Sequence, residues 1–204
     1  LADGSLYGLE YAGKVIIEDG HGPKLDAFRA FVNNDTWGYQ SWFQKGLHNL
    51  QHRATASKLR RNDNGSLSLA FTVISQAPNV ARQHGGTSGG VIRVEELTQR
   101  PFGENDFRFV TNHIWTVYPD GSIELQSSIT SNDPAFKLPR IGYAMTVPKS
   151  FARFDYYGRG PVNNYNDRKV SQYIEHYNSS VADMFVNFPK PQDMANREEV
   201  RWCA

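Results

Sequence analysis

Apolar and polar residues alternate with a period of two along most of the chain. In the segment 66–75 (SLSLAFTVIS), every second residue from Leu67 to Val73 is apolar, and the residues between them are small or polar. The segment 122–129 (SIELQSSI) repeats this pattern. Because successive side chains of a strand point to opposite faces, both segments are predicted to be strands with one buried face. The segment 107–118 has large apolar residues at both odd and even positions, so both faces of a strand would be apolar. This predicts an inner strand packed between two layers.

Short turn sequences separate these segments and predict hairpins. They are Ala12-Gly13, Asn62–Gly65 (NDNG) and Pro119–Gly121 (PDG). Only the segment 42–52 resembles a helix, and Gly46 interrupts it. Repeated antiparallel strands with little helix predict an all-β protein built as a large two-layer antiparallel sandwich.

No shift in composition marks a domain boundary, so we expect residues 1–204 to form a single sandwich domain. Residues 79–90 (NVARQHGGTSGG) contain many glycines and few apolar groups, which predicts a mobile insertion. The final segment 198–204 (EEVRWCA) has the pattern of a strand bearing Trp202, and no turn or capping residue follows it. We therefore expect the fold to be truncated at its C-terminal end; an ordinary terminal strand is the alternative.

The segment 156–168 (YYGRGPVNNYNDR) combines two glycines and a proline with several amides and charges. Glycine weakens a strand and proline donates no ladder hydrogen bond, so the whole segment is predicted to be a loop. Its aromatic, amide and guanidinium groups are those that bind sugars by stacking and by paired hydrogen bonds. A second cluster of this kind comprises Asn33, Asn34, Asp35, Trp37, Tyr39 and Trp42. The alternative is that these polar groups close the loops by bonding their own backbone.

Composition narrows the classes of partner. The 204 residues are 39% hydrophobic, which is enough for a packed core. Twenty-two Lys and Arg against 21 Asp and Glu give a net charge of +1, so neither nucleic acid nor a membrane surface is an expected partner. A single cysteine, Cys203, excludes an internal disulfide and a cysteine-rich zinc site. Neither a membrane span nor a signal peptide is recognisable, and the compartment stays open between cytoplasm and periplasm.

Candidate catalytic and metal-binding side chains are few. His48 and His52 are spaced to share one face of a helix, but no third ligand is evident, and packing is the better interpretation. His113 lies in the predicted inner strand, where a satisfied core imidazole is the common role. Loop acids such as Asp35 and Asp167 have no spacing that shows two carboxyl groups converging, as glycoside hydrolysis requires.

Four segments resemble the C-terminal domain of glycoside hydrolase family 2 β-galactosidases, which is also known as the β-galactosidase small chain. They are GPKLDAFRAFVNND (22–35), LPRIGYAMTVP (138–148), YYGRGPVNNYNDR (156–168) and PKPQDMANREEVRW (189–202). They occur in the family's order and span nearly the whole chain. The resemblance implies the two-layer supersandwich shared with galactose mutarotases, of which residues 1–204 would be the N-terminal two-thirds.

The resemblance also implies a function for the parent protein, hydrolysis of terminal β-D-galactosides. The two catalytic glutamates of this family lie in a preceding barrel domain, and no segment here resembles their surroundings. The chain alone is therefore expected to be inactive, with the barrel domain of the same enzyme and a β-galactoside as partners. A homo-oligomeric parent is expected. No cofactor is expected in this fragment, whereas Mg or Na is compatible with the catalytic domain of the parent.

Two groups of residues follow from the family's motifs. The loop at the mouth of the active site corresponds to Asn33, Asn34, Asp35 and Trp37, in a motif that begins at Arg29. The second group is a structural motif of Arg159, Asn164, Tyr165, Asp167 and Arg168. Of these residues, Asn164, Asp167 and Arg168 are expected to brace neighbouring loops on the side that faces the barrel. Phe31 replaces a proline of the family pattern, Asn33 an aspartate and Asn163 a glutamate, so other β-glycosides remain open as substrates.

A different class of function stays open beside this one. The chain could be a stand-alone carbohydrate-binding or mutarotase-like module of the same fold. A mutarotase needs a general acid and a general base on the concave face, typically a histidine with a glutamate. His113 is the only imidazole that the sequence places in an inner strand.

Overall fold

The computed structural model describes residues 2–32, 34–35, 38–79, 101–190 and 193–204. By its internal contacts the chain divides into two compact units, one of residues 1–29 and 37–146 and one of residues 30–36 and 147–204. We call them the first and the second unit. The single domain over residues 1–204 stays a prediction. Residues 80–90 of the predicted mobile insertion, together with Asn33 and Trp37, lie outside the described residues.

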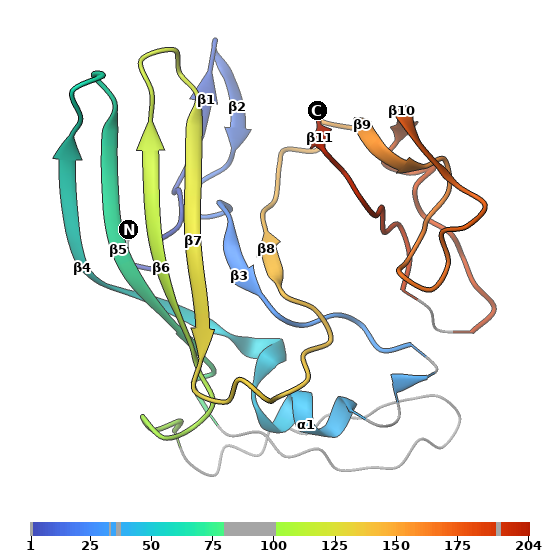
Figure 1. The fold of residues 1–204 in the computed structure, drawn as a ribbon, viewed down its shortest axis with the longest axis horizontal. Coiled ribbons are helices and arrows are strands. Elements are labelled where there is room, and N and C mark those ends of the chain that lie inside the picture. Colours follow the sequence, from blue (N-terminus) through green and yellow to red (C-terminus); the bar gives the residue numbers. More distant parts are fainter. Residues whose placement is uncertain (1, 33, 36–37, 80–100, 191–192) are drawn as a thin grey trace. The chain divides into compact units, whose positions relative to one another are not determined.

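The protein is nearly all β, as predicted (Figure 1). The strands of the first unit are β1 (Leu9–Tyr11), β2 (Lys14–Ile17), β3 (Lys24–Asp26), β4 (Gln51–Arg61), β5 (Leu67–Gln76), β6 (Phe109–Val117), β7 (Ile123–Ser131) and β8 (Gly142–Ala144). Those of the second unit are β9 (Arg153–Gly160), β10 (Tyr173–Ser180) and β11 (Trp202–Cys203). Every strand pairing in the described ranges is antiparallel, which agrees with an all-β sandwich. No helix among the described residues is long and apolar enough to cross a membrane.

The largest sheet has the order β4-β5-β6-β7 and carries the core of the first unit. The period-two pattern sets its faces: Leu69 pairs with Trp115, and Val73 pairs with Thr111, on one side. On the other side, polar pairs such as Ser68 with Thr116 (3.0 Å between hydroxyl oxygens) form hydrogen bonds. The strands predicted at 66–75 and 122–129 are thereby confirmed, and so is the inner position of β6. The apolar face predicted to be buried in 122–129 is only half-buried in β7. The expected second covering layer over β6 is not found in the described residues, since the side chain of Ile114 is 41% exposed.

The three predicted hairpin turns are confirmed. Ala12-Gly13 joins β1 to β2 with positive φ at both residues (50° and 74°), the geometry that suits a two-residue hairpin. Asn62–Gly65 joins β4 to β5, and Pro119–Gly121 joins β6 to β7.

The helix predicted over residues 42–52 is shorter and begins earlier. Helix α1 covers Tyr39–Gln44, and a 3-10 helix, η2, covers Leu47–Asn49 before β4 begins. Gly46 separates them with φ 72°, a left-handed conformation that glycine adopts without strain and that ends an α-helix. The apolar face of α1, with Trp42 fully buried, is what holds this short helix in place.

The second unit is organised around β9, in a sheet of order β10-β9-β11. Strand β11 is the strand predicted near the chain end. The residue before β11 also bonds to β9, because Arg201 N donates to Tyr157 O (2.8 Å). The prediction that all of 156–168 is a loop is wrong for residues 156–160, which are part of β9. Gly158 is tolerated there because the backbone of Val200 packs against it: a Cβ atom at Gly158 would lie 2.9 Å from Val200 Cα.

Candidate functional site

In the loop that resembles an active-site lip, two of the named residues are described, the exposed Asn34 and the buried Asp35. Asp35 is 4% exposed, and its Oδ2 accepts a hydrogen bond from Val32 N at 2.8 Å. Its own backbone N–H donates to Val32 O at 3.0 Å, so the residue closes the turn in both directions. Asn34 is exposed beside it. The turn therefore presents the amide of Asn34 to solvent and keeps the carboxylate of Asp35 inside.

Arg29, the first residue of the same motif, packs on the helix of the first unit. Its guanidinium carbon lies 5.6 Å from the ring centroid of Trp42, a cation–π distance. Trp42 Nε1 in turn donates to Lys137 O at 3.2 Å. These contacts give Arg29 a packing role in the described structure.

Asn164 is the centre of the hydrogen-bond network in the second unit. Its side chain is fully buried, and its Nδ2 donates to Arg159 O (2.9 Å) and Val162 O (3.0 Å), on the two sides of the cis Gly160-Pro161 bond. Its Oδ1 accepts from Glu198 N at 2.7 Å. Only an amide offers two donors and an acceptor in this arrangement, so Asn164 ties the turn after β9 to the segment that leads into β11.

Two arginines extend this network. Arg159 Nη1 donates to Gln172 O at 2.7 Å, and the guanidinium forms an ion pair with Glu199. The hydrogen bond from Arg159 lowers the pKa of Glu199. Arg197 Nε donates to the hydroxyl of the buried Tyr156 at 2.8 Å. The first arginine thus joins β9 to the turn that precedes β10 and to the segment that leads into β11, and the second joins that same segment to the core.

The remaining residues of the predicted structural motif lie in a small turn. Tyr165 and Arg168 exchange backbone hydrogen bonds (3.3 and 2.8 Å), and the Arg168 guanidinium lies 5.1 Å from the Tyr165 ring centroid. Burial, followed by the nearby Asp193 carboxylate, raises the pKa of Tyr165. Asp167 is exposed, and in the described part of the chain its side chain makes no hydrogen bond or ion pair. The bond between Asn164 and the Glu198 backbone agrees with bracing, and for Asp167 and Arg168 bracing stays a prediction.

Sequence reasoning missed several members of this network. Asn196 Nδ2 donates to Asn164 O at 2.6 Å, and Gln172 Nε2 donates to Asn163 O at 3.3 Å. The segment 189–202 was recognised as a motif, but its contact with 156–168 was not predicted. The available signal was that both motifs contain side-chain amides.

Comparison with known proteins identifies the family. The family model described as "Beta galactosidase small chain" matches residues 1–204, the whole chain. The chain belongs to the β-galactosidase small-chain family. The resemblance inferred from the four sequence segments is thereby confirmed.

The curated relatives of this small-chain domain are named beta-galactosidase. That of Priestia megaterium is 32% identical over 89 residues, which are 44% of this chain and 9% of the relative. Those of Halalkalibacterium halodurans (27% identical) and Kluyveromyces lactis (24% identical) each match 98% of this chain. The chain spans only 17% of the length of either of these two proteins.

Two histidines of the small-chain domain, His113 and His52, are built into the packing of its large sheet. His113 is buried, its Nδ1 lies 2.9 Å from Ser127 Oγ, and burial lowers its pKa. Its direct cross-strand neighbours are Phe71 and Ser127, and the Tyr143 ring lies 5.7 Å away, so none of these neighbours is a carboxylate. Burial, and then the Lys24 charge, lowers the pKa of His52. Within the described ranges no three His, Cys, Asp or Glu side chains form a group that could hold a metal ion.

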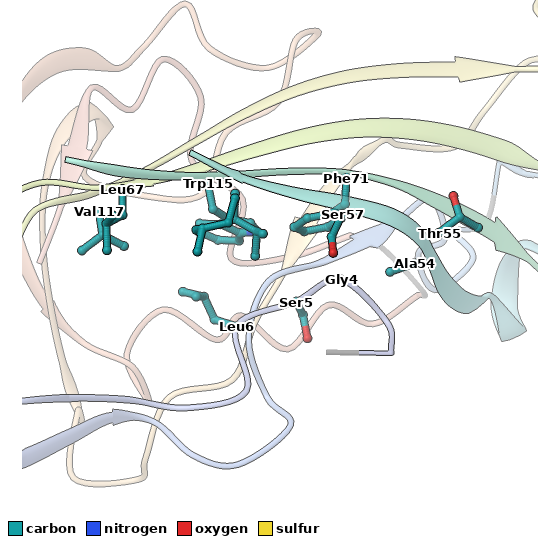
Figure 2. Close-up of a pocket in the computed structure, with 12 residues that line it drawn as sticks. Gly4, Ser5, Leu6, Ala54, Thr55, Ser57, Leu67, Phe71, Trp115 and Val117 are labelled. Atoms are coloured by element: carbon teal, nitrogen blue, oxygen red, sulfur yellow. The ribbon is translucent and has the colours of Figure 1, made fainter. Parts of the chain in front are cut away.

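A cavity of about 470 Å³ lies in the first unit between the large sheet and the N-terminal segment (Figure 2). Figure 2 shows the side chains of Leu67, Trp115 and Phe71 extending from the sheet toward Leu6 and Gly4. Gly4 approaches closely because it has no Cβ: one placed there would lie 2.5 Å from Val73 Cγ2. The lining is apolar apart from serine and threonine hydroxyls and holds no ionisable group, so this cavity does not support acid–base chemistry.

Proposed function

We propose that the chain is a non-catalytic domain of a retaining β-galactosidase, and that it completes the rim of the active site and supports assembly of the enzyme. The observation that carries the proposal is the family match over residues 1–204. Relatives that match nearly the whole chain are named beta-galactosidase and are about six times longer, as their 17% coverage implies. The catalytic barrel domain of the same enzyme would then be the immediate partner.

The chemistry of the carboxyl groups supports a non-catalytic role. Hydrolysis of a glycoside uses two carboxyl groups, and the one that acts as general acid has a raised pKa. Among the described residues, four carboxyl groups have a pKa that clearly differs from the ordinary value, and in all four the pKa is lowered. They are Asp3, Asp120, Glu124 and Glu199. Lowered pKa values favour the charged form, which is suited to ion pairs and turn closure.

The proposed rim is formed by Asn33, Asn34, Asp35 and Trp37. The support lies in the turn geometry: the buried Asp35 fixes the backbone, and the exposed Asn34 offers a planar amide that can pair with sugar hydroxyls. The substrate would be a terminal β-D-galactoside, and the parent is proposed to be a homo-oligomer. Any Mg²⁺ or Na⁺ that the parent uses is proposed to bind in its catalytic domain.

The test is steady-state hydrolysis of 4-nitrophenyl β-D-galactopyranoside by the intact parent enzyme. For Asn34→Ala we expect KM to rise about two- to tenfold, the cost of one hydrogen bond, without a change in thermal stability. Asn166→Ala is the matched control, because Asn166 is also an exposed loop asparagine. Unchanged kinetics in Asn34→Ala would refute the rim assignment. A parent that cleaves other β-glycosides but no galactoside would refute the substrate.

A further inference from the structure

One face of the sheet in the second unit carries three solvent-exposed aromatic rings side by side. His176 pairs with Tyr157, and Tyr157 pairs with Trp202, so the three residues occupy one row across β10, β9 and β11 on the same face. The exposed fractions are 39% for Tyr157, 48% for Trp202 and 61% for the His176 side chain. The ring centroids of His176 and Trp202 lie 5.4 Å apart. We call this row the aromatic row.

The next positions along the same face hold a connected set of planar polar groups. Asn178 pairs with Asp155 across β10 and β9, and its Nδ2 donates to Asp155 Oδ1. Its Oδ1 accepts a hydrogen bond from Arg153 Nη2. His176 Nε2 lies 3.8 Å from the same Asp155 oxygen, which links this set to the aromatic row. A guanidinium, an amide and a carboxylate are thus held in a line beside exposed rings.

The opposite face of the sheet shows that these rings are not simply part of the core. There Tyr156 is fully buried, with the rings of Phe154 and Tyr177 each 5.5 Å from its own. The core of this sheet therefore lies on the side of Tyr156. On the other side, Trp202 and the His176 side chain stay about half exposed in the described chain, and clusters of exposed aromatic side chains mark binding surfaces.

We propose that this face binds a neutral hexopyranoside, with the C–H face of the sugar stacked on Trp202 and His176 and its hydroxyls bonded to Asp155, Asn178 and Arg153. Sugars require this pairing of an aromatic surface with adjacent donors and acceptors that are already oriented. The charges of Arg153 and Asp155 cancel, so the face has no excess positive charge with which to select phosphates or nucleic acid. The assignment does not depend on which glycoside the parent enzyme hydrolyses.

The test is fluorine NMR of the intact parent protein labelled with 5-fluorotryptophan. The Trp202 resonance is assigned by its loss in Trp202→Phe, and the probe is methyl 1-thio-β-D-galactopyranoside, which resists hydrolysis. We expect a saturable shift of that resonance with a dissociation constant on the order of 1 mM, as for a small ligand on an open surface. In His176→Ala or Asp155→Asn the constant should rise about tenfold.

Tyr173→Ala is the matched control, because Tyr173 is 69% exposed on the same strand but on the other face. It should leave the Trp202 titration unchanged, and dispersed resonances of the other tryptophans verify folding of each variant. No saturable response at roughly a hundredfold excess over that constant overturns the proposal. A response that His176→Ala and Asp155→Asn leave intact also overturns it. So does a Trp202 shift that depends on protein concentration in the absence of sugar, because such a shift would indicate contact between copies of the protein. Galactoside hydrolysis is measured on the same samples: a Trp202 response in a parent without that activity would count against the proposed function and still support this face.

Discussion

The hydrogen bonds of Asn164 give the sharpest prediction from the structure. In Asn164→Ala, the carbonyl oxygens of Arg159 and Val162 lose a donor, and the Glu198 N–H loses its acceptor at 2.7 Å. The asparagine side chain is fully buried, so water does not replace these bonds without rearrangement. Each of the three lost bonds costs about 1 kcal/mol, and a buried group left unsatisfied adds at least about 1 kcal/mol, so the loss is about 4 kcal/mol or more.

Hydrogen–deuterium exchange in the intact protein measures this loss where it occurs. The amide of Arg159 donates to Glu198 O, so its protection reports whether the segment that leads into β11 stays attached to β9. A loss of about 4 kcal/mol lowers the protection of this amide about a thousandfold. The thermal midpoint should fall as well, since domains are stable by only about 5–15 kcal/mol.

Two further variants separate hydrogen bonding from shape. Asn164→Asp keeps the shape and the acceptor but removes both donors and faces a carboxylate toward two carbonyl groups, so it should be at least as destabilising as alanine at neutral pH. Asn166→Ala, at an exposed position two residues away, should change stability by less than about 0.5 kcal/mol. If Asn164→Ala cost less than about 1 kcal/mol, or if Asn164→Asp were neutral, the network would not hold these segments together.

Two other predictions concern stability. Burial of Asp3 raises its pKa, but hydrogen bonds from a neighbouring serine and the Lys24 ammonium outweigh this and lower the pKa from 3.8 to about 2. The stabilisation by the charged Asp3 carboxylate is therefore complete above pH 3.8 and is lost as the pH falls through about 2. Urea unfolding at neutral pH should show that Asp3→Asn lowers the unfolding free energy by about 1 kcal/mol, a value that allows for solvent screening. Ala195 has φ 63°, a left-handed conformation that favours glycine, so Ala195→Gly should raise the unfolding free energy by about 0.5–1 kcal/mol, whereas Ala182→Gly on the surface should not.

The local pattern of the sequence was sufficient to predict the strands that pair with the strand next to them in the chain. In 66–75 the alternation alone defines the buried face of β5, and the turn Asn62–Gly65 fixes its partner. The error at 156–160 has the opposite origin. The backbone of Val200 fits against Gly158, and this partner lies about 40 residues away, where no local rule on glycine in strands accounts for it. Long-range packing decided that segment.

In the candidate site, too, the sequence alone does not predict which polar side chains are buried and bonded. Asn164 and Asp167 stand three residues apart in one motif, and both were expected to brace the loop. One is fully buried with its bonds satisfied, and the other is exposed without a side-chain bond in the described structure. A sequence lists polar groups, but the direction in which each side chain points depends on the tertiary partner, here the segment 196–198.

The contact between two family motifs changes how the departures from the family pattern bear on function. Because the segments 156–168 and 189–202 bond each other through Asn164, Asn196 and Glu198, they act as one structural unit. Asn163, which replaces a glutamate of the family pattern, is buried inside this unit. A buried carboxylate needs a charged partner, whereas an amide needs only hydrogen bonds, so this replacement bears on packing in the second unit. Two asparagines, Asn33 and Asn163, replace carboxylates of the family pattern. Asn33 is therefore the position at which a change of sugar preference should be sought first.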